Sequence, residues 1–413
     1  VTQLEDEIGR MEKELGAYDR QLGEQLLSLG LAYQAADRHD QAAEVLNRAL
    51  HLKRVNDGLH DLGQVPVLQE LIESNIATES WDELDRNYQL LLFVHRRNYE
   101  AGDPRFLPIV DQMGSWKLQA YREQLLKQEG MSTIREAERL FGDTIKLLEA
   151  QYGKTDPRLI EPLYGKALTN YEIMKHEASR PIEDFRTGGS HSAISYRQVC
   201  RAVPTPAGPR MQCFTMPVFS PDFSRYVSQQ QQKDLSVEQR LFAAKRTLLR
   251  IVEIHEAHSE LPVTSHALAL VHLGDWHMLY DQRGTALGHY KRAYTLLAAG
   301  GSNQEVIRKL FGAPASVPSL RLSVAAVKDK LAADDTASDF VRVSFDVSSS
   351  GKARNVSIIE ESPSESAFSA RRAKEYIKSS KYRPRFENGE PVDTAGVQVR
   401  IPIRLLTANP GDA

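Results

Sequence analysis

The histidines between positions 255 and 277 are the residues whose type and spacing come closest to a metal site. His255 and His258 lie three residues apart in His-Glu-Ala-His, whereas the zinc-protease helix needs two histidines four apart to place both on one face. His266, His272 and His277 follow near one face of a predicted helix, and a helical repeat explains His277 better than metal binding does. We therefore predict no metal site and no cofactor.

Motifs for covalent or phosphate chemistry are also absent from the sequence. It contains no glycine-rich phosphate loop of the right spacing and no Gly-x-Ser-x-Gly element. The carboxylates are numerous, but none forms an isolated pair in an apolar context. We expect a protein that is not an enzyme and has no catalytic residues. An enzyme hidden in the insertion described below is the weaker alternative.

The two cysteines, Cys200 and Cys213, flank a turn-rich stretch, Pro204–Pro209, that can bring them together. In an oxidising compartment they would form a disulfide closing a short loop, worth ~3 kcal/mol. The alternatives are two free thiols in a cytosolic chain, or a zinc site, which two cysteines without nearby histidines do not complete. We favour the disulfide.

Length and charge exclude several classes of protein. The chain has 413 residues, enough for two or three domains. Its 52 basic and 55 acidic residues nearly balance, so no global field indicates nucleic acid or an anionic membrane. No apolar run approaches the ~20 residues of a membrane-spanning helix. The chain begins with Val1 instead of Met, which is compatible with removal of a leader or membrane anchor.

An apolar stripe near the N-terminus predicts the first helix. Its members are Leu4, Ile8, Met11, Leu15, Tyr18 and Leu22. Their alternating spacing of four and three residues is typical of a coiled coil and equally of a helix buried against its successor. We favour the second interpretation.

Two segments fit a tetratricopeptide-like helical hairpin. In this repeat, small residues at positions 8 and 20 let two antiparallel helices approach closely, and larger residues fill the groove between hairpins. The first segment has Leu26, Leu29, Gly30, Tyr33, Ala42, Leu46 and Ala49 at positions 4, 7, 8, 11, 20, 24 and 27. The second has Leu270, Leu273, Gly274, His277, Ala286, Tyr290 and Ala293 at the same positions.

The hairpins between these two are less regular. Leu68, Leu71, Leu84, Tyr88 and Leu91 fit one without the small residues. Two more follow the similar entrances 102–106 and 155–159, each with Asp-Pro, which suits a helix cap and the first helical position. These units resemble the longer repeats of kinesin light chains. We predict about five helical pairs, enough for a curved solenoid.

An insertion at 178–235 interrupts the helical array. Ile194–Arg201 and Arg210–Met216 predict two strands of a disulfide-tied hairpin, and helix is expected again from about 236. The insertion is either a functional loop or a cap on the concave face. After the array, glycines and prolines predict a connector with short helices at about 303–311 and 324–332.

The last seventy or so residues predict a small mixed domain. Phe340–Val347 alternates apolar and polar residues, Ser348–Gly351 is a turn, and Ala353–Glu360 continues as a second strand. Ser362-Pro-Ser-Glu365 predicts a helix start, and the helix runs through Ala370, Ala373 and Ile377. Tyr382–Phe386 is extended, Asn388-Gly389 marks a tight turn, and Val397, Val399, Ile401 and Ile403 alternate along a last strand.

This β-β-α-β order, with its Tyr-x-Pro and Asn-Gly-x-Pro-Val elements, resembles the C-terminal domain of TonB, the bacterial energy transducer. The resemblance covers roughly 339–405. It implies a domain that adds a strand to a partner, such as a segment of an outer-membrane transporter, at the edge formed by Val397, Val399, Ile401 and Ile403. TonB domains usually have a Tyr-Pro pair before the first strand, and Pro318–Val324 lacks one.

Basic residues gather in the same domain. They are Arg371, Arg372, Lys374, Lys378, Lys381, Arg383 and Arg385. They could form a surface for an acidic partner such as peptidoglycan. The domain has 12 basic and 9 acidic residues, so we favour a solvated helix face. Nucleic acid is not expected, since only Tyr376 and Tyr382 lie among the basic residues.

The sequence thus predicts a mostly α protein with three parts. A tetratricopeptide-like solenoid covers 1–310, a connector 311–338, and a small α+β domain 339–413. We expect a non-enzymatic periplasmic adaptor or scaffold that binds outer-membrane or other envelope proteins through the solenoid groove and by strand addition, in transport or another envelope complex. The alternative is an oligomerisation or cell-wall-anchoring module, with recognition by the solenoid alone.

Overall fold

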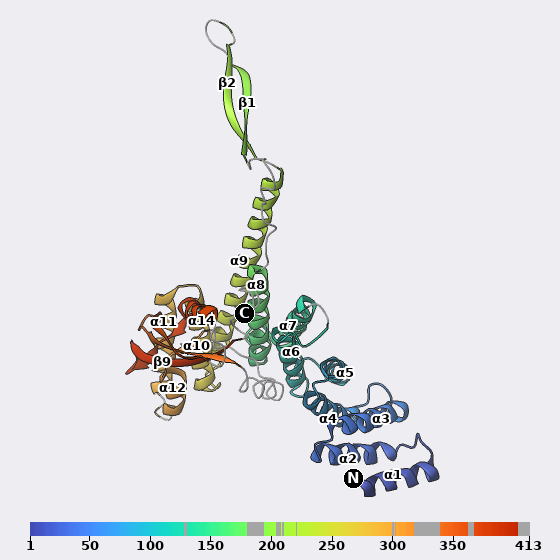
Figure 1. Cartoon of the computed structure of the whole chain (residues 1–413). Helices are drawn as coiled ribbons and strands as arrows, with labels where there is room; N and C mark the ends of the chain where they lie inside the picture. The colour runs from blue at the N-terminus through green and yellow to red at the C-terminus, as the bar shows by residue number, and fades with distance from the viewer. Residues whose placement is uncertain are drawn as a thin grey trace. The chain divides into compact units, whose positions relative to one another are not determined.

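A computed structural model gives the fold (Figure 1). It describes residues 1–127, 130–179, 194–203, 208, 210–219, 221–299, 301, 303–317, 339–361 and 367–403. The chain divides into two compact units. One comprises Val1–Asn170 with Ala243–Ala408, and the other centres on Tyr171–Phe242. The first unit therefore contains most of the helical array together with the C-terminal domain.

Most of the described residues before position 312 lie in helices, as predicted. These are α1 (Thr2–Leu15), α2 (Leu22–Ala35), α3 (His39–Asp57), α4 (Gln64–Ala77), α5 (Trp81–Asn98), α6 (Leu107–Arg122), α7 (Gly130–Tyr152), the 3-10 turn η1 (Pro157–Leu159), α8 (Ile160–Ser179), α9 (Pro221–Ala257), α10 (Val263–Leu279), α11 (Arg283–Ala299) and α12 (Gln304–Phe311). The first three are the blue helices of Figure 1.

The two well-fitting repeats form the hairpins α2–α3 and α10–α11. All fourteen of their repeat positions are buried. The glycines explain the close approach of the helices: a Cβ on Gly30 would lie 2.6 Å from Leu46, and one on Gly274 would lie 2.5 Å from Tyr290. The tetratricopeptide-like hairpins are therefore confirmed, and the larger residue of one helix occupies the space that glycine leaves on the other.

Phe141 of α7 packs in the same way between two further glycines. Its side chain is fully buried. A Cβ on Gly114 of α6 would lie 2.1 Å from the Phe141 ring, and one on Gly165 of α8 would lie 2.3 Å from it. The ring is thus held between two helices and has no free side toward which it could move.

Gly114→Ala is expected to destabilise the array by about 1–3 kcal/mol, because the new methyl overpacks against Phe141. The matched control is Gly142→Ala in α7, where the nearest atom to the new Cβ is the Lys166 Nζ at 3.4 Å. That substitution should be neutral or stabilising by up to ~1 kcal/mol, because alanine favours helix over glycine. Chemical denaturation compares the two; equal effects would contradict the packing role of Gly114.

The N-terminal stripe does not form one continuous helix. The first helix ends at Leu15, where Gly16 adopts a φ of 92°. Leu15 and Tyr18 are 47% and 64% exposed. Ile8 is buried and packs with the cluster that includes residues of α2. The structure supports the interpretation of a helix buried against its successor. The prediction that the apolar stripe continues along the same helix beyond residue 15 is wrong, because Gly16 ends the helix.

In both Asp-Pro entrances, the aspartate accepts a main-chain hydrogen bond within a turn that leads toward a helix. Asp103 Oδ1 accepts a hydrogen bond from the Arg105 N–H at 2.8 Å, and Asp156 Oδ1 accepts one from the Arg158 N–H at 3.0 Å. Asp156 is the N-cap of η1, which leads into α8. The predicted cap, with Asp before Pro at the first helical position, is confirmed at Asp156. It is wrong at Asp103, because α6 begins only at Leu107 with Phe106 as its N-cap, and Asp103 closes the turn before it.

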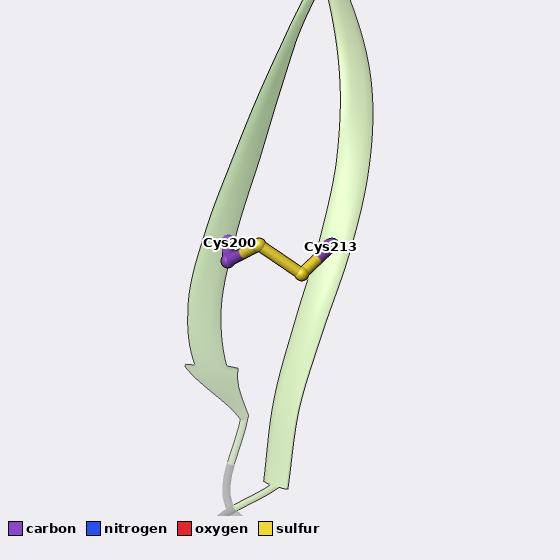
Figure 2. The surroundings of a disulfide bond; sticks show 2 residues. All are labelled: Cys200 and Cys213. Carbon is purple, nitrogen blue, oxygen red and sulfur yellow. A yellow bond between two sulfur atoms is a disulfide. The ribbon is translucent and has the colours of Figure 1, made fainter.

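The insertion forms the predicted two-stranded hairpin. Strands β1 (Ile194–Val203) and β2 (Arg210–Phe219) pair in antiparallel register with Cys200 directly opposite Cys213. The two cysteines form a disulfide, with their Cα atoms 3.9 Å apart (Figure 2). The disulfide is therefore confirmed. The bond fixes the register of the hairpin, since sliding either strand would separate the two residues.

The helix after the hairpin was placed wrongly. It begins at Pro221, not near 236, and runs without a break to Ala257 as α9 (Figure 1). Its first half, which includes Gln229–Gln232, lacks the apolar periodicity that marks a buried face. Good helix formers can extend a helix without such periodicity. The apolar periodicity therefore did not indicate the first half of α9.

The C-terminal domain has a three-stranded antiparallel sheet in the order β5-β4-β9. Its elements are β4 (Phe340–Val347), β5 (Ala353–Glu361), α14 (Ala367–Ser379), β6 (Tyr382–Arg383), β7 (Arg385–Glu387), β8 (Glu390–Val392) and β9 (Thr394–Pro402). The predicted strands, helix and Asn388-Gly389 turn are confirmed; both turn residues have positive φ. The predicted helix start at 362–365 and the connector from 318 to 338 lie outside the described residues.

The core of this domain lies between the sheet and α14. Val341, Val343 and Phe345 point inward from β4, where every second residue is buried. Ala373 and Ile377 of α14 complete the same cluster. This alternation is the period-two pattern from which the strand was predicted.

Candidate functional site

The histidines singled out in the sequence do not form one cluster. His255 is buried with its ring stacked on His266 at 5.5 Å, whereas His258 binds the exposed Glu260 at 2.7 Å. His272 contacts the ring of Tyr164 and His277 stacks on His289. In the described part of the chain, no group of three or more His, Cys, Asp or Glu residues could hold a metal ion.

The last strand, β9, lies at an edge of the C-terminal sheet. Among the described strands it pairs with β4 only. The pairing is continuous over six residue pairs, from Phe340 opposite Pro402 to Phe345 opposite Val397. A strand in this position presents every second N–H and C=O away from its neighbour.

The opposite edge, β5, is less regular. Its pairing with β4 shifts register twice, between Arg342 and Val343 and again between Ser344 and Asp346. Asn355 within β5 has a positive φ of 52°. Bulges of this kind twist an edge and obstruct pairing with another strand. Of the two edges, β9 is therefore the better template for an added strand.

The four predicted edge residues differ in their surroundings. Ile401 is 2% exposed and belongs to the core, and Val397 and Ile403 pack against that core. Val399 is 36% exposed. Three of the four residues lie in β9, with Val399 the most open of them, whereas Ile403 lies just beyond the end of the strand at Pro402. The side chains of Val397 and Ile401 anchor the strand on the domain, and its main chain forms the edge.

A second region of interest joins the C-terminal domain to the helical array. The short strand β3 (Ala315–Ser316), which follows α12, pairs with β6. The Val317 N–H donates to the Lys381 carbonyl at 3.1 Å. This strand falls in the part predicted as connector, and its two residues are too few for a periodic pattern. Main-chain pairing therefore continues from the end of the array into the domain.

A buried charge pair lies at this junction. Arg383 Nη1 of β6 lies 3.1 Å from Asp275 Oδ1 of α10, with side chains 4% and 1% exposed. The Tyr290 hydroxyl of α11 donates to the same carboxylate oxygen at 2.8 Å. Burial, together with this carboxylate, raises the pKa of Tyr290 well above its ordinary value, so the hydroxyl stays protonated and remains a donor.

Aromatic rings and an outer ion pair surround this charge pair. The ring of Phe386 in β7 packs against the rings of Tyr290, Tyr294 and Phe311, with ring centroids 5.1–6.2 Å apart. Lys381 Nζ lies 2.8 Å from both carboxylate oxygens of Asp281. These two bonds, with two more from Arg283, lower the pKa of Asp281 to about 2. The junction is thus a small aromatic core that contains one buried ion pair and has a second ion pair at its surface.

The basic cluster predicted in this domain is not one surface. Lys381 and Arg383 bind aspartates of the helical array, as described above, and Arg385 pairs with Glu387 at 2.7 Å. Arg371 on α14 pairs with Glu375. The sequence could not show that these cations are used within the chain, because their partners at 275 and 281 lie about a hundred residues away.

A search of curated proteins found no match. No helix in the described ranges has both the length and the apolar character needed to cross a membrane.

Solved structures that match include two of the TPR-like repeats of a kinesin light chain from Podosopora anserina. Both have 12% identity, with TM-scores of 0.38 and 0.39; they cover 67% and 69% of this chain and 95% and 99% of their own. BtubC (BKLC) from P. vanneervenii has 11% identity and a TM-score of 0.37, covering 73% of this chain and 89% of that one. The family model that matches, at residues 330–404, is the Gram-negative bacterial TonB protein C-terminal.

Proposed function

We propose that this protein is a non-enzymatic adaptor of the Gram-negative periplasm that binds envelope proteins at two places. One is the helical array, and the other is the edge of β9 that faces away from β4. The tetratricopeptide-like hairpins and the TonB-type domain support the general role of a protein-interaction scaffold. The TonB match and the Cys200–Cys213 disulfide support the oxidising compartment.

The position of β9 carries the proposal of strand addition. An extended segment of an outer-membrane or other envelope protein would continue the sheet as a fourth strand. Its main chain would bond to the outward N–H and C=O groups of β9, and its side chains would alternate between the two faces. The six pairs between β9 and β4 run without a register shift over Val397–Pro402.

The junction gives the two binding places a common frame. Because β3, Arg383 and Phe386 attach the TonB-type domain to α10–α12, a segment bound at β9 would be held at a fixed position relative to the last helical hairpin. A protein with this geometry links two partners. It differs from a chain whose terminal domain swings freely on a linker.

Proline substitution at Gln398 or Val399 is expected to abolish capture of a partner by strand addition. N–H groups of successive residues point to opposite edges of a strand, so one of the two prolines removes a donor from the edge that faces away from β4 and leaves the β4 pairing intact. The measurement is a pull-down from a Gram-negative envelope extract, with bound segments identified by mass spectrometry.

Val399→Ala is the control, because it shortens the side chain and retains the N–H. Circular dichroism identifies which proline variant keeps the native sheet. If that variant captures the same segments as the unmodified chain, strand addition at β9 is rejected. The proposal requires loss of at least one captured segment that Val399→Ala retains.

A further inference from the structure

A groove of about 910 Å³ lies where α6 and α8 begin. Its wall is largely apolar and includes Leu107, Tyr152 and four prolines, at 104, 108, 157 and 162. Asp111 and Glu161 also line it. The size is within the range of pockets that hold small ligands or a few residues of a peptide.

The two Asp-Pro-Arg turns border this groove, and in each turn the arginine binds the aspartate of the same turn. Arg105 binds Asp103 through Nε at 2.9 Å and Nη2 at 2.7 Å, and its guanidinium covers the ring of Tyr99 at 4.1 Å. Arg158 lies 3.2 Å from Asp156 and covers the Tyr152 ring at 3.7 Å. Each guanidinium thus neutralises the aspartate of its own turn.

The carboxylates of Asp111 and Glu161 have no such compensation. Within the described residues, neither has a hydrogen bond or ion pair. Asp111 is partly buried, and its Oδ1 atom is buried without a donor, whereas Glu161 is exposed at the rim of the groove. Burial raises the pKa of Asp111, and burial together with the nearby Asp111 raises the pKa of Glu161. A carboxylate whose charged form is disfavoured by desolvation or by a neighbouring carboxylate is stabilised when a cation lies beside it.

We propose that this groove binds an extended peptide segment that places one lysine or arginine side chain beside Asp111 and Glu161. The apolar stem of such a side chain would pack on Leu107, Tyr152 and the prolines, and its charged end would reach the two carboxylates. A bare metal ion fits less well, because the described residues offer no third ligand here. This inference rests on the proposed role as a scaffold and assigns a partner chemistry to the array.

A displayed library of random twelve-residue peptides, selected on the full-length protein at pH 7.5, tests the proposal. We expect enrichment of sequences with a conserved lysine or arginine. The double variant Asp111→Asn/Glu161→Gln should bind the enriched peptides at least about tenfold more weakly, since loss of an ion pair with the partly buried Asp111 has that effect. The control variant Asp6→Asn/Glu14→Gln removes two exposed carboxylates of α1 and should bind them normally.

Failure takes a clear form. Enrichment of peptides without a basic residue, no enrichment, or equal binding by the two double variants would each overturn the proposal. Because amides replace carboxylates of the same shape, the groove variant should keep its thermal midpoint or raise it. The pull-down described for β9 is repeated on this variant: unchanged capture there shows that the groove result is independent of strand addition.

Discussion

Replacing Arg383 by methionine is expected to lower the free energy of unfolding by about 3–5 kcal/mol. The substitution keeps most of the side-chain volume but leaves the Asp275 carboxylate, 1% exposed, without the guanidinium that lies 3.1 Å away. Removing one partner of a buried pair has an effect of this size, because the other charge stays buried and uncompensated. Denaturation followed by tryptophan fluorescence measures it, since Trp276 lies on α10 beside Asp275.

The size of this effect depends on burial, and the chain offers an internal comparison. Arg385 lies two residues away and pairs with Glu387 at the surface, with side chains 34% and 55% exposed. Arg385→Met should cost less than about 1 kcal/mol. Adding Asp275→Asn to Arg383→Met should recover part of the lost stability, because the stranded charge is then removed. Equal losses of stability from the two arginine substitutions would show that the buried ion pair between Arg383 and Asp275 does not stabilise this junction.

Local patterns allowed much of the fold to be predicted. Gly30 and Gly274 identified helical hairpins because a small residue at a fixed repeat position determines how closely two helices approach. The alternation in β4 and the Asn388-Gly389 turn were equally informative. In each case, the residues that set the structure lie within about thirty positions of one another.

Features that depend on distant residues could not be predicted. Arg383 was assigned to a solvated basic face, since nothing near it in the sequence indicates that Asp275 is its partner. The groove carboxylates Asp111 and Glu161 come from two different hairpins, fifty residues apart. The repeated Asp-Pro-Arg turns were the available signal, but they were interpreted only as helix starts. Tertiary packing decides which charges meet, and a single sequence does not contain that information directly.

Acidification is expected to destabilise the region where α10 meets α8 and the TonB-type domain. Burial lowers the pKa of His272 to about 4. The carboxylate of Asp275 opposes this shift, and the guanidinium of Arg383 adds to it. The pKa of His289 is also lowered to about 4, first by burial and then by His277, Arg292 and Lys245.

The direction follows from proton binding in the two states. The unfolded chain has the ordinary histidine pKa of 6.5, so between about pH 6.5 and 4 it binds more protons than the folded chain does. Stability is therefore greatest above pH 6.5 and falls as the pH falls. For His272 the loss approaches about 2 kcal/mol at pH 5 and about 3 kcal/mol near pH 4. His289 contributes less than this, because it is only half-buried and is partly screened by solvent.

Denaturation curves at pH 7.5, 6 and 5 would show this dependence, and His272→Phe separates the contribution of His272 from the rest. Phenylalanine retains an aromatic ring against Tyr164 but cannot take up a proton. Between pH 7.5 and 5, the free energy of unfolding of this variant should therefore fall by about 2 kcal/mol less than that of the unmodified protein. His258→Gln, which changes a histidine paired with the exposed Glu260, should leave the pH dependence largely as it was. If His272→Phe and His258→Gln respond to pH alike, protonation of His272 is not what weakens the junction in acid.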